Sequence, residues 1–399
     1  MSAPNRQRLG ISRTVVVLGI VSLLTDVSSE GIYPLIPLFL TNVLHAGVTA
    51  VGLIEGIAES SASLLRIFSG WLSDVLRNRK WISTAGYALS TISKPLFAVT
   101  TSWQQVLGIR FADRVGKGIR TAPRDALIAD VTPAGSRGIS FGFHRAMDTT
   151  GAIAGPLLAF WLLRSVGAGY RTIFLLSAVP AILGVLILIA FVREPARRTE
   201  VSEATPSLRL GAFNRPFKLF LLVMVVFSLG NSSDVFLILR AQNVGVSVGS
   251  VLLIYVLFNT VQAALSTAAG AVSDRLGRRN VIIAGYLIFA VVYAGFGLAV
   301  GGPTGIWVLF AFYGMYHALT AGVQKAFATD LISAGMRGTG LGAYHMLTGL
   351  ALLPASVFAG YLWDAVSPSA PFYFGAATAV IAALLLAVLF RGSATYTAT

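Results

Sequence analysis

The sequence contains no cysteine, which excludes disulfide bridges, thiolate metal sites and thiol catalysis. Histidine is also scarce, because only four occur, far apart in the chain, at His45, His144, His317 and His345. This spacing is unlike that of metal ligands. A phosphate-binding loop is missing too, since the Gly-Lys of "RVGKGIR" at 114–120 has no Ser or Thr after it. We therefore expect no metal ion, no cofactor and no enzyme activity.

Charge is scarce as well. Charged residues make up 12% of the chain, hydrophobic residues make up 55%, and the mean hydropathy is +0.77. This composition is too apolar for soluble domains and is typical of a chain that has lipid as its solvent. The 30 basic and 16 acidic residues give a net charge of +14. The basic residues mostly lie between apolar runs, which indicates membrane topology and not a nucleic-acid partner.

Apolar runs of about 20 residues, each long enough to cross a bilayer as a helix, follow one another along the chain. The twelve runs cover roughly residues 14–40, 49–75, 81–100, 104–129, 138–164, 170–192, 217–240, 249–273, 280–300, 304–330, 338–363 and 371–390. Basic residues concentrate in alternate connectors, which places those connectors and both termini in the cytoplasm. The first run lacks a small-residue cleavage site and reads as a membrane helix, not a signal peptide. The sequence predicts a multi-pass protein of the cytoplasmic (inner) membrane.

The chain repeats itself at a spacing of 200 residues. "GWLSDVLRNRK" at 70–80 aligns with "GAVSDRLGRRN" at 270–280, and "DVTPAGSRG" at 130–138 aligns with "DLISAGMRG" at 330–338. Two halves with the same internal order indicate a parallel repeat about an axis along the membrane normal. We expect an all-α polytopic protein with twelve transmembrane helices in two six-helix pseudo-symmetric bundles. The expected bundles are residues 1–192 and 217–399, joined by a cytoplasmic linker, 193–216.

The second copy of the repeated loop, "GAVSDRLGRR", resembles the loop motif of the major facilitator superfamily. The resemblance implies a transporter of that fold that works by alternating access. The aspartates of the two copies, Asp74 and Asp274, can accept hydrogen bonds from a helix N-terminus or pair with Arg137 or Arg337. We expect these four residues and Arg275 to form gating contacts at the cytoplasmic side.

Two further stretches resemble motifs of transporters in this superfamily. "GAIAGPLLA", from Gly151, is similar to the fifth-helix motif of proton-coupled antiporters. "PLIP", from Pro34, resembles the end of the first helix in twelve-helix drug antiporters. Gly151 and Gly155 let helices approach closely, and Pro156 removes a backbone donor, so the motif predicts a tightly packed interface that can bend. The resemblance implies antiport and efflux.

Polar side chains follow one face of the fourth run. At about 100° per residue they fall within an arc of about 140°. They are Arg110, Asp113, Arg114, Lys117, Arg120, Thr121, Arg124 and Asp125. A charge near the bilayer centre costs at least about 2.5 kcal/mol, so this stripe must face a partner or a watery cavity. We expect Arg110, Asp113, Arg114 and Lys117 to line the substrate cavity with Asp234 and His317, and Arg124 and Asp125 to serve gating.

Four carboxylates are candidates for proton coupling, because a carboxylate can take up a proton when it is desolvated and release it when a cation approaches. They are Asp26, Glu30, Glu59 and Asp148. Asp26 and Glu30 are four residues apart on one helix face and lie at the same depth as Arg110, so they can neutralise Arg110 and Arg114. Alternatively, these charges are structural ion pairs that hold the first bundle together.

These patterns predict a secondary active transporter that moves a small organic solute with an anionic or zwitterionic group by proton-coupled efflux. Its partners are the solute, protons and the lipid bilayer, and we expect a monomer. A proton-coupled importer of the same fold is an open alternative. A receptor or scaffold that does not transport is another, supported by Val75 and Arg77 in the first loop, where the motif has a basic residue and a glycine.

Overall fold

The computed structural model describes residues 11–76, 78–133, 136–194, 213–332 and 337–391. Every regular element in this part of the chain is helical. The elements are α1 (Arg13–Ile32), α2 (Leu35–Asn42), α3 (Val48–Leu76), α4 (Arg79–Leu96), the 3-10 turn η1 (Phe97–Val99), α5 (Trp103–Asp130), α6 (Arg137–Ser165), α7 (Tyr170–Leu176), α8 (Ala178–Phe191), α9 (Arg215–Gly230), α10 (Val235–Asn243), α11 (Val248–Leu276), α12 (Arg278–Leu298), α13 (Gly302–Leu331), α14 (Arg337–Ala365) and α15 (Ala370–Leu389).

These helices form twelve membrane-length segments that match the twelve apolar runs. Ten segments of the described chain are long and apolar enough to cross a membrane, and α1 with α2, α7 with α8 and α9 with α10 each count as one. The other two are α4 and α5. Both have the length of a membrane helix, but they carry too many polar side chains to qualify by hydropathy. The two segments with the weakest apolar character therefore lie next to each other in the chain.

The first segment of each half of the sequence is interrupted at equivalent points. α1 ends at Ile32 and α2 begins at Leu35, with Pro34 at the junction, where the missing N–H breaks the helical hydrogen bonding. α9 ends at Gly230 and α10 begins at Val235 after the polar sequence "NSSD". The two junctions are 200 residues apart, as the repeat requires. Interrupted helices at matching positions of a repeat are typical of the binding region in transporters.

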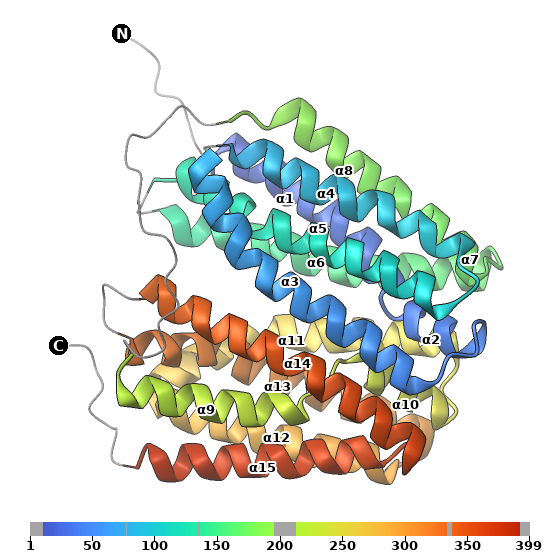
Figure 1. The fold of residues 1–399 in the computed structure, drawn as a ribbon, viewed down its shortest axis with the longest axis vertical. Helices are drawn as coiled ribbons and strands as arrows, with labels where there is room; N and C mark the ends of the chain where they lie inside the picture. Colours follow the sequence, from blue (N-terminus) through green and yellow to red (C-terminus); the bar gives the residue numbers. More distant parts are fainter. Residues whose placement is uncertain (1–10, 77, 134–135, 195–212, 333–336, 392–399) are drawn as a thin grey trace. The chain divides into compact units, whose positions relative to one another are not determined.

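The chain forms two compact units. The described residues of unit 1 lie within Met1–Tyr33, Leu65–Thr100 and Gly108–Glu203, and those of unit 2 lie within Pro34–Leu64, Thr101–Leu107 and Ala204–Thr399. α3 and α5 therefore each contribute residues to both units. Within unit 1, α1 packs against α6 and α8, and α4 packs against α8 (Figure 1). Within unit 2, α12 packs against α13 and α15, and α15 also packs against α9.

The two units have different cores. In unit 1, aliphatic side chains of α1, α5 and α8 pack around Tyr87, among them Leu18, Val21, Leu127 and Leu188. In unit 2, aromatic rings stack on one another, with centroids 4.0 Å apart for Phe227 and Tyr286 and 3.9 Å apart for Phe289 and Tyr293. Aromatic contacts of this kind add to the energy of burial.

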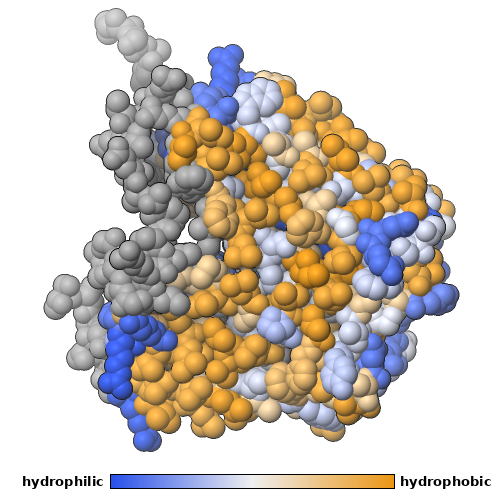
Figure 2. Space-filling model, in the orientation of Figure 1, coloured by the Kyte–Doolittle hydropathy of each residue, from blue (hydrophilic) through white to orange (hydrophobic). Residues whose placement is uncertain are grey.

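Hydrophobic side chains dominate the described surface (Figure 2). Leu186, Val291 and Leu384 are each more than half exposed. Hydrophilic residues in this view gather toward the ends of the helices. An apolar surface of this extent is far larger than a soluble monomer exposes, which agrees with helices that face lipid.

Candidate functional site

Buried basic residues lie beside Tyr33 at the end of α1, in unit 1. The guanidinium carbon of Arg110 is 5.2 Å from the centroid of the Tyr33 ring, and that of Arg114 is 6.0 Å away, which is the range of cation–π contacts. Arg110 Nη1 lies 3.5 Å from Asp113 Oδ2, and Asp113 also accepts a hydrogen bond from Ser90 of α4. Arg110, Asp113 and Arg114 are at most 6% exposed. This part of the stripe therefore faces the interior of unit 1 and not lipid.

Lys94 of α4 belongs to this cluster, although sequence reasoning missed it. Its side chain is 1% exposed, and its Nζ has no hydrogen-bond partner among the described residues. The charges that act on it belong to Asp113, Arg120, Asp26 and Arg114. A signal was available, because Lys94 is the only charged residue in the apolar run 81–100. A lone lysine in a membrane segment is a candidate functional residue.

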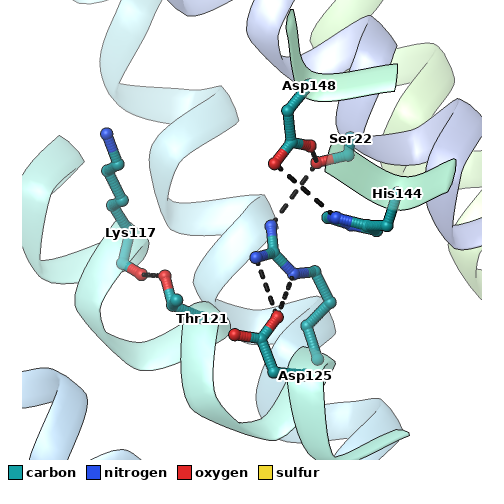
Figure 3. Close-up of polar contacts among 7 residues, drawn as sticks. Ser22, Lys117, Thr121, Asp125, His144 and Asp148 are labelled. Carbon is teal, nitrogen blue, oxygen red and sulfur yellow. Dashed lines mark hydrogen bonds and ion pairs between the residues drawn. The ribbon is translucent and has the colours of Figure 1, made fainter. Parts of the chain in front are cut away.

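A second polar cluster in unit 1 links α1, α5 and α6 (Figure 3). Ser22 of α1 donates a hydrogen bond to Asp148 of α6 and accepts one from Arg124 Nη1 at 3.4 Å. Arg124 Nε and Nη2 donate to Asp125 Oδ1 at 3.0 and 2.9 Å. His144 Nδ1 lies 3.6 Å from Asp148 Oδ2. The expected coupling residue Asp148 is thus joined through Ser22 to the expected gating residues.

Ser22 was not expected, because serine is common in membrane helices and its sequence position gives no signal. Lys117 lies apart from the Asp148 cluster, and its backbone oxygen accepts a hydrogen bond from Thr121 Oγ1 at 2.6 Å (Figure 3). Of the stripe on α5, Arg110, Asp113 and Arg114 therefore belong to the cluster at Asp113, and Arg124 and Asp125 belong to the cluster at Asp148.

Asp26 lies on α1 one turn beyond Ser22. The charges that act on it come from Asp148, Glu30, Arg120 and Lys117. The sequence pattern also pairs Asp26 with Arg110, because their depths match. That pairing stays a prediction, and the structure adds Arg120 and Lys117 as cations of α5 whose charges act on Asp26.

The Gly151 motif packs α6 directly against the backbone of α1. A Cβ atom added at Gly151 would lie 2.7 Å from Leu23 O and 2.8 Å from Asp26 Cβ. One added at Gly155 would lie 2.6 Å from Val27 O. Real Cβ atoms do not approach backbone oxygens this closely, so neither position tolerates a side chain without a shift of the helices. The motif therefore holds the helix of Asp148 against the helix of Asp26.

In unit 2, aromatic side chains surround the junction of α9 and α10. Tyr313 Oη donates to Asp234 Oδ1 at 2.6 Å, and Asn231 Nδ2 donates to Tyr316 Oη at 3.3 Å. The ring of His317 lies edge-on to Tyr313 and Tyr316, with both centroid distances at 4.9 Å. The two residues expected from this half of the chain, Asp234 and His317, are thus brought together. They offer a solute one carboxylate and several aromatic faces.

The first half of α3 also lies in unit 2, where it packs along α14. Asp364 accepts hydrogen bonds at the start of α3 from Val48 N at 3.2 Å, Thr49 N at 2.8 Å and Thr49 Oγ1 at 2.7 Å. Ser60 Oγ donates to Gly349 O at 2.7 Å. Sequence reasoning missed Asp364, because nothing in its own segment shows that it meets a helix N-terminus 315 residues away. A carboxylate satisfies the free N–H groups and the dipole of that terminus.

The same arginine contact recurs in both units at the end where the linker joins. Arg79, at the start of α4, pairs with Asp130 at the end of α5. Arg278, at the start of α12, pairs with Asp330 near the end of α13 at 2.6 Å. Sequence reasoning did not find these pairs, although all four residues lie within the repeated stretches.

The expected gating residues are only partly described. Asp274 Oδ1 lies 3.7 Å from Arg278 Nη2, and Arg275 is exposed. The side chains of Asp74, Arg137 and Arg337 lie outside the described part of the structure. Glu59 is on the first half of α3 in unit 2, so it belongs to a different unit from the other coupling candidates. Among the described residues, no group of three or more His, Asp or Glu side chains could hold a metal ion.

Comparisons with known proteins identify the family. The model of the major facilitator superfamily matches residues 18–241 and 219–398. An uncharacterized MFS-type transporter of Methanocaldococcus jannaschii is 38% identical over 384 residues, which are 94% of each chain. The cis,cis-muconate transport protein of Acinetobacter baylyi is 24% identical over 326 residues, 77% of each chain.

The fold comparison agrees. The crystal structure of the nucleoside transporter NupG superposes with a TM-score of 0.78 at 14% identity, covering 95% of this chain and 100% of the other. The expected all-α fold of twelve transmembrane segments is thereby confirmed. The chain belongs to the major facilitator superfamily and is a multi-pass secondary transporter of a small molecule, not an enzyme.

Proposed function

We propose that the chain exports a small organic solute that carries a carboxylate, alone or within a zwitterion, in exchange for protons. The observation that carries this proposal is the set of buried cations in unit 1, Arg110, Arg114 and Lys94, in the same unit as Asp26 and Asp148. Cations inside a membrane segment cost at least about 2.5 kcal/mol each on insertion scales. Recognition of an anion offsets that cost, because a desolvated cation gains most from a countercharge that it can hydrogen-bond.

The transporter works by alternating access as a monomer in the cytoplasmic membrane, with both termini in the cytoplasm, as the basic connectors indicate. The class of solute has support from one relative, because muconate, named for the Acinetobacter baylyi protein, is a dicarboxylate.

Proton coupling resides in Asp26 and Asp148. Their negative charges act on each other, and a proton bound to the pair relieves the repulsion. The ammonium group of a zwitterion would relieve the same repulsion, so solute and proton compete for the pair. Competition for one site is the condition for exchange, and it agrees with the antiporter-like motif at Gly151.

A second candidate is proton-coupled import of a pure anion, which the shared cations of α5 favour. The positive charges of Arg120 and Lys117 act on Asp26. An anion that bound these two cations would neutralise their charge, and Asp26 would then bind a proton more readily. Anion and proton would then bind together, which is the condition for transport in one direction.

The deciding experiment uses the purified protein in proteoliposomes with an imposed pH gradient and a panel of organic acids and zwitterions. Exchange predicts that solute and protons move in opposite directions, and movement in the same direction establishes the importer instead. If no compound produces a proton flux, the chain does not couple transport to protons.

Two variants test the coupling residues in the same vesicles. Asp26→Asn or Asp148→Asn should abolish uphill transport and leave exchange without a gradient measurable. Glu194→Gln is the matched control. Glu194 accepts hydrogen bonds from Arg79 N and Lys80 N at the exposed start of α4, and the amide oxygen of glutamine can still accept one of the two. This control should transport normally. Uphill transport by both aspartate variants would place the coupling elsewhere.

A further inference from the structure

Lys94 stands out among the charged residues of unit 1 because it is almost completely buried and has an unused amine. Its Nζ has no hydrogen-bond partner among the described residues, although an ammonium group offers three donors. Leaving a buried charge unpaired is among the most unfavourable arrangements inside a protein. The amine therefore needs oxygen atoms that a ligand could supply.

The carboxylate that acts most strongly on Lys94 is already engaged. Asp113 accepts a hydrogen bond from Ser90 and lies 3.5 Å from Arg110. The charge of Arg114 acts on Asp113 as well. Asp113 thus serves as a fixed countercharge that several cations share, and it leaves the donors of Lys94 unmatched.

The groups around Lys94 fit a carboxylate. Arg110 and Arg114, which share Asp113 with Lys94, present guanidinium groups near the Tyr33 ring, and a guanidinium matches the two oxygens of a carboxylate. Tyr33 lies at the junction of α1 and α2, where the helix is interrupted. An aromatic ring beside the cations offers a face to the apolar part of an organic acid.

We propose that Lys94 anchors a carboxylate-binding site in unit 1, at which the solute's carboxylate binds Lys94 and Arg114 in competition with Asp113. This inference rests on the proposed function and deepens it, because it assigns the anionic group of the solute to particular side chains. When no solute is bound, the negative charge of Asp113 partly neutralises the buried cations. When the solute binds, its carboxylate supplies the acceptor oxygens that the Lys94 amine lacks.

The test titrates the full-length protein in lipid nanodiscs with cis,cis-muconate, benzoate and succinate, each beside its neutral amide, by calorimetry. At least one carboxylate should bind, and its amide should not. Lys94→Met should weaken that binding by about tenfold or more, the value of a hydrogen bond to a charged group. Lys94→Arg, which keeps the charge, should retain most of the affinity.

Lys80→Met on the same helix is the matched control. The Lys80 amine donates to Ile189 O at 2.9 Å at the exposed end of α4, so binding should be unchanged. Equal binding by wild type and Lys94→Met would overturn the proposal. Failure of all three carboxylates to bind would overturn it too.

Asp113→Asn gives a test of opposite sign that does not depend on how Lys94→Met folds. Its amide oxygen can still accept the hydrogen bond of Ser90, but the competing charge is gone. The carboxylate should therefore bind several-fold more tightly, whereas a purely structural role for the cluster predicts unchanged or weaker binding, which would contradict the proposal.

Proteoliposomes separate the two proposals. Carboxylate binding that depends on Lys94, without any solute-dependent proton flux, would refute the proposed coupling and leave the site intact. Proton-coupled transport of a carboxylate by Lys94→Met with an unchanged KM would refute the site and leave the function intact.

Discussion

The two halves of the sequence have the same helix pattern, but the interiors of units 1 and 2 differ in chemistry. On α5 the interior positions carry charges, and 200 residues further on, α13 carries rings or small residues instead. The α5 residues Arg110, Asp113, Arg114 and Lys117 correspond to Phe310, Tyr313, Gly314 and His317 of α13. Because α13 packs without charges at these four positions, the fold does not require charges there. The charges of unit 1 must therefore have another reason, and we attribute them to the solute and the proton.

The features that the two units share support this distinction. Both halves of the sequence interrupt their first membrane segment at matching positions. Both also join an arginine at the start of one helix to an aspartate at or near the end of another, Arg79 to Asp130 and Arg278 to Asp330. What is shared lies at helix ends and junctions, and what differs lies in the interior.

The largest effect is expected where unit 1 packs more tightly than unit 2. Gly155→Ala introduces the residue that unit 2 has at the equivalent position, Ala355. The new methyl group would lie 2.6 Å from Val27 O, and overpacking of this kind costs about 1–3 kcal/mol. Because the methyl group would also lie 2.7 Å from Gly31 N, the cost should lie toward the upper end of this range and exceed the gain in helix propensity, about 1 kcal/mol. Thermal unfolding of the purified protein should therefore show a lower midpoint.

Gly142→Ala on the same helix is the control, because no atom outside the helix lies within 4 Å of the added methyl group. Its midpoint should be unchanged or slightly higher. If the Gly155 and Gly142 variants unfold at the same temperature, the close contact of α1 and α6 is not rigid.

A smaller effect is expected at the start of α3. Asp364→Ala removes three hydrogen bonds to that helix, which should weaken its contact with α14 by about 1–2 kcal/mol. Since the natural chain has no cysteine, Ala50→Cys gives a single labelling site near the contact. A maleimide reagent should label it several-fold faster in the Asp364→Ala background. Asp364→Asn keeps one acceptor oxygen, so its labelling rate should lie between the rates with Asp364 intact and with Asp364→Ala. Equal labelling rates in all three backgrounds would exclude a role for Asp364.

The smallest effect concerns the shared arginine pairs. Arg79→Ala and Arg278→Ala should each lower stability by up to about 1 kcal/mol, because both pairs are partly exposed. The two shifts in unfolding midpoint should be alike. A much larger shift for one of them would show that the two ends are not equivalent, against the repeat.

The sequence predicted the fold well, because hydropathy and the 200-residue repeat depend only on residue order. It also led to the stripe on α5, since helical periodicity alone puts Arg110 and Asp113 on one face. The partner of each charge was harder to predict. The pairing of Asp26 with Arg110 stays a prediction. The cations Arg120 and Lys117, which also act on Asp26, could not be chosen from depth, because depth says nothing about tilt or rotation.

Other residues gave little or no local signal. Asp364 meets Thr49 only through the packing of α14 on α3. Ser22 joins Arg124 to Asp148 with a side chain that many membrane helices contain. Lys94 was predictable in principle, because a single lysine interrupts an apolar run. Its neighbours on α5, however, depend on how α4 packs on α5, through the close approach of Gly86 to Gly116 and the hydrogen bond of Ser90 to Asp113.

The central claim is that the charges of unit 1 serve the solute and not the fold. The double variant Lys94→Met with Asp113→Asn tests it most directly, because it removes one positive and one negative charge and keeps both volumes. Replacing buried charges by neutral groups of similar size is often neutral or stabilising. We predict that the variant unfolds at the same temperature as wild type or higher, and that it binds the carboxylates about tenfold or more weakly than Asp113→Asn alone does. A variant that fails to fold, or that folds and binds them as tightly as Asp113→Asn does, would contradict the account.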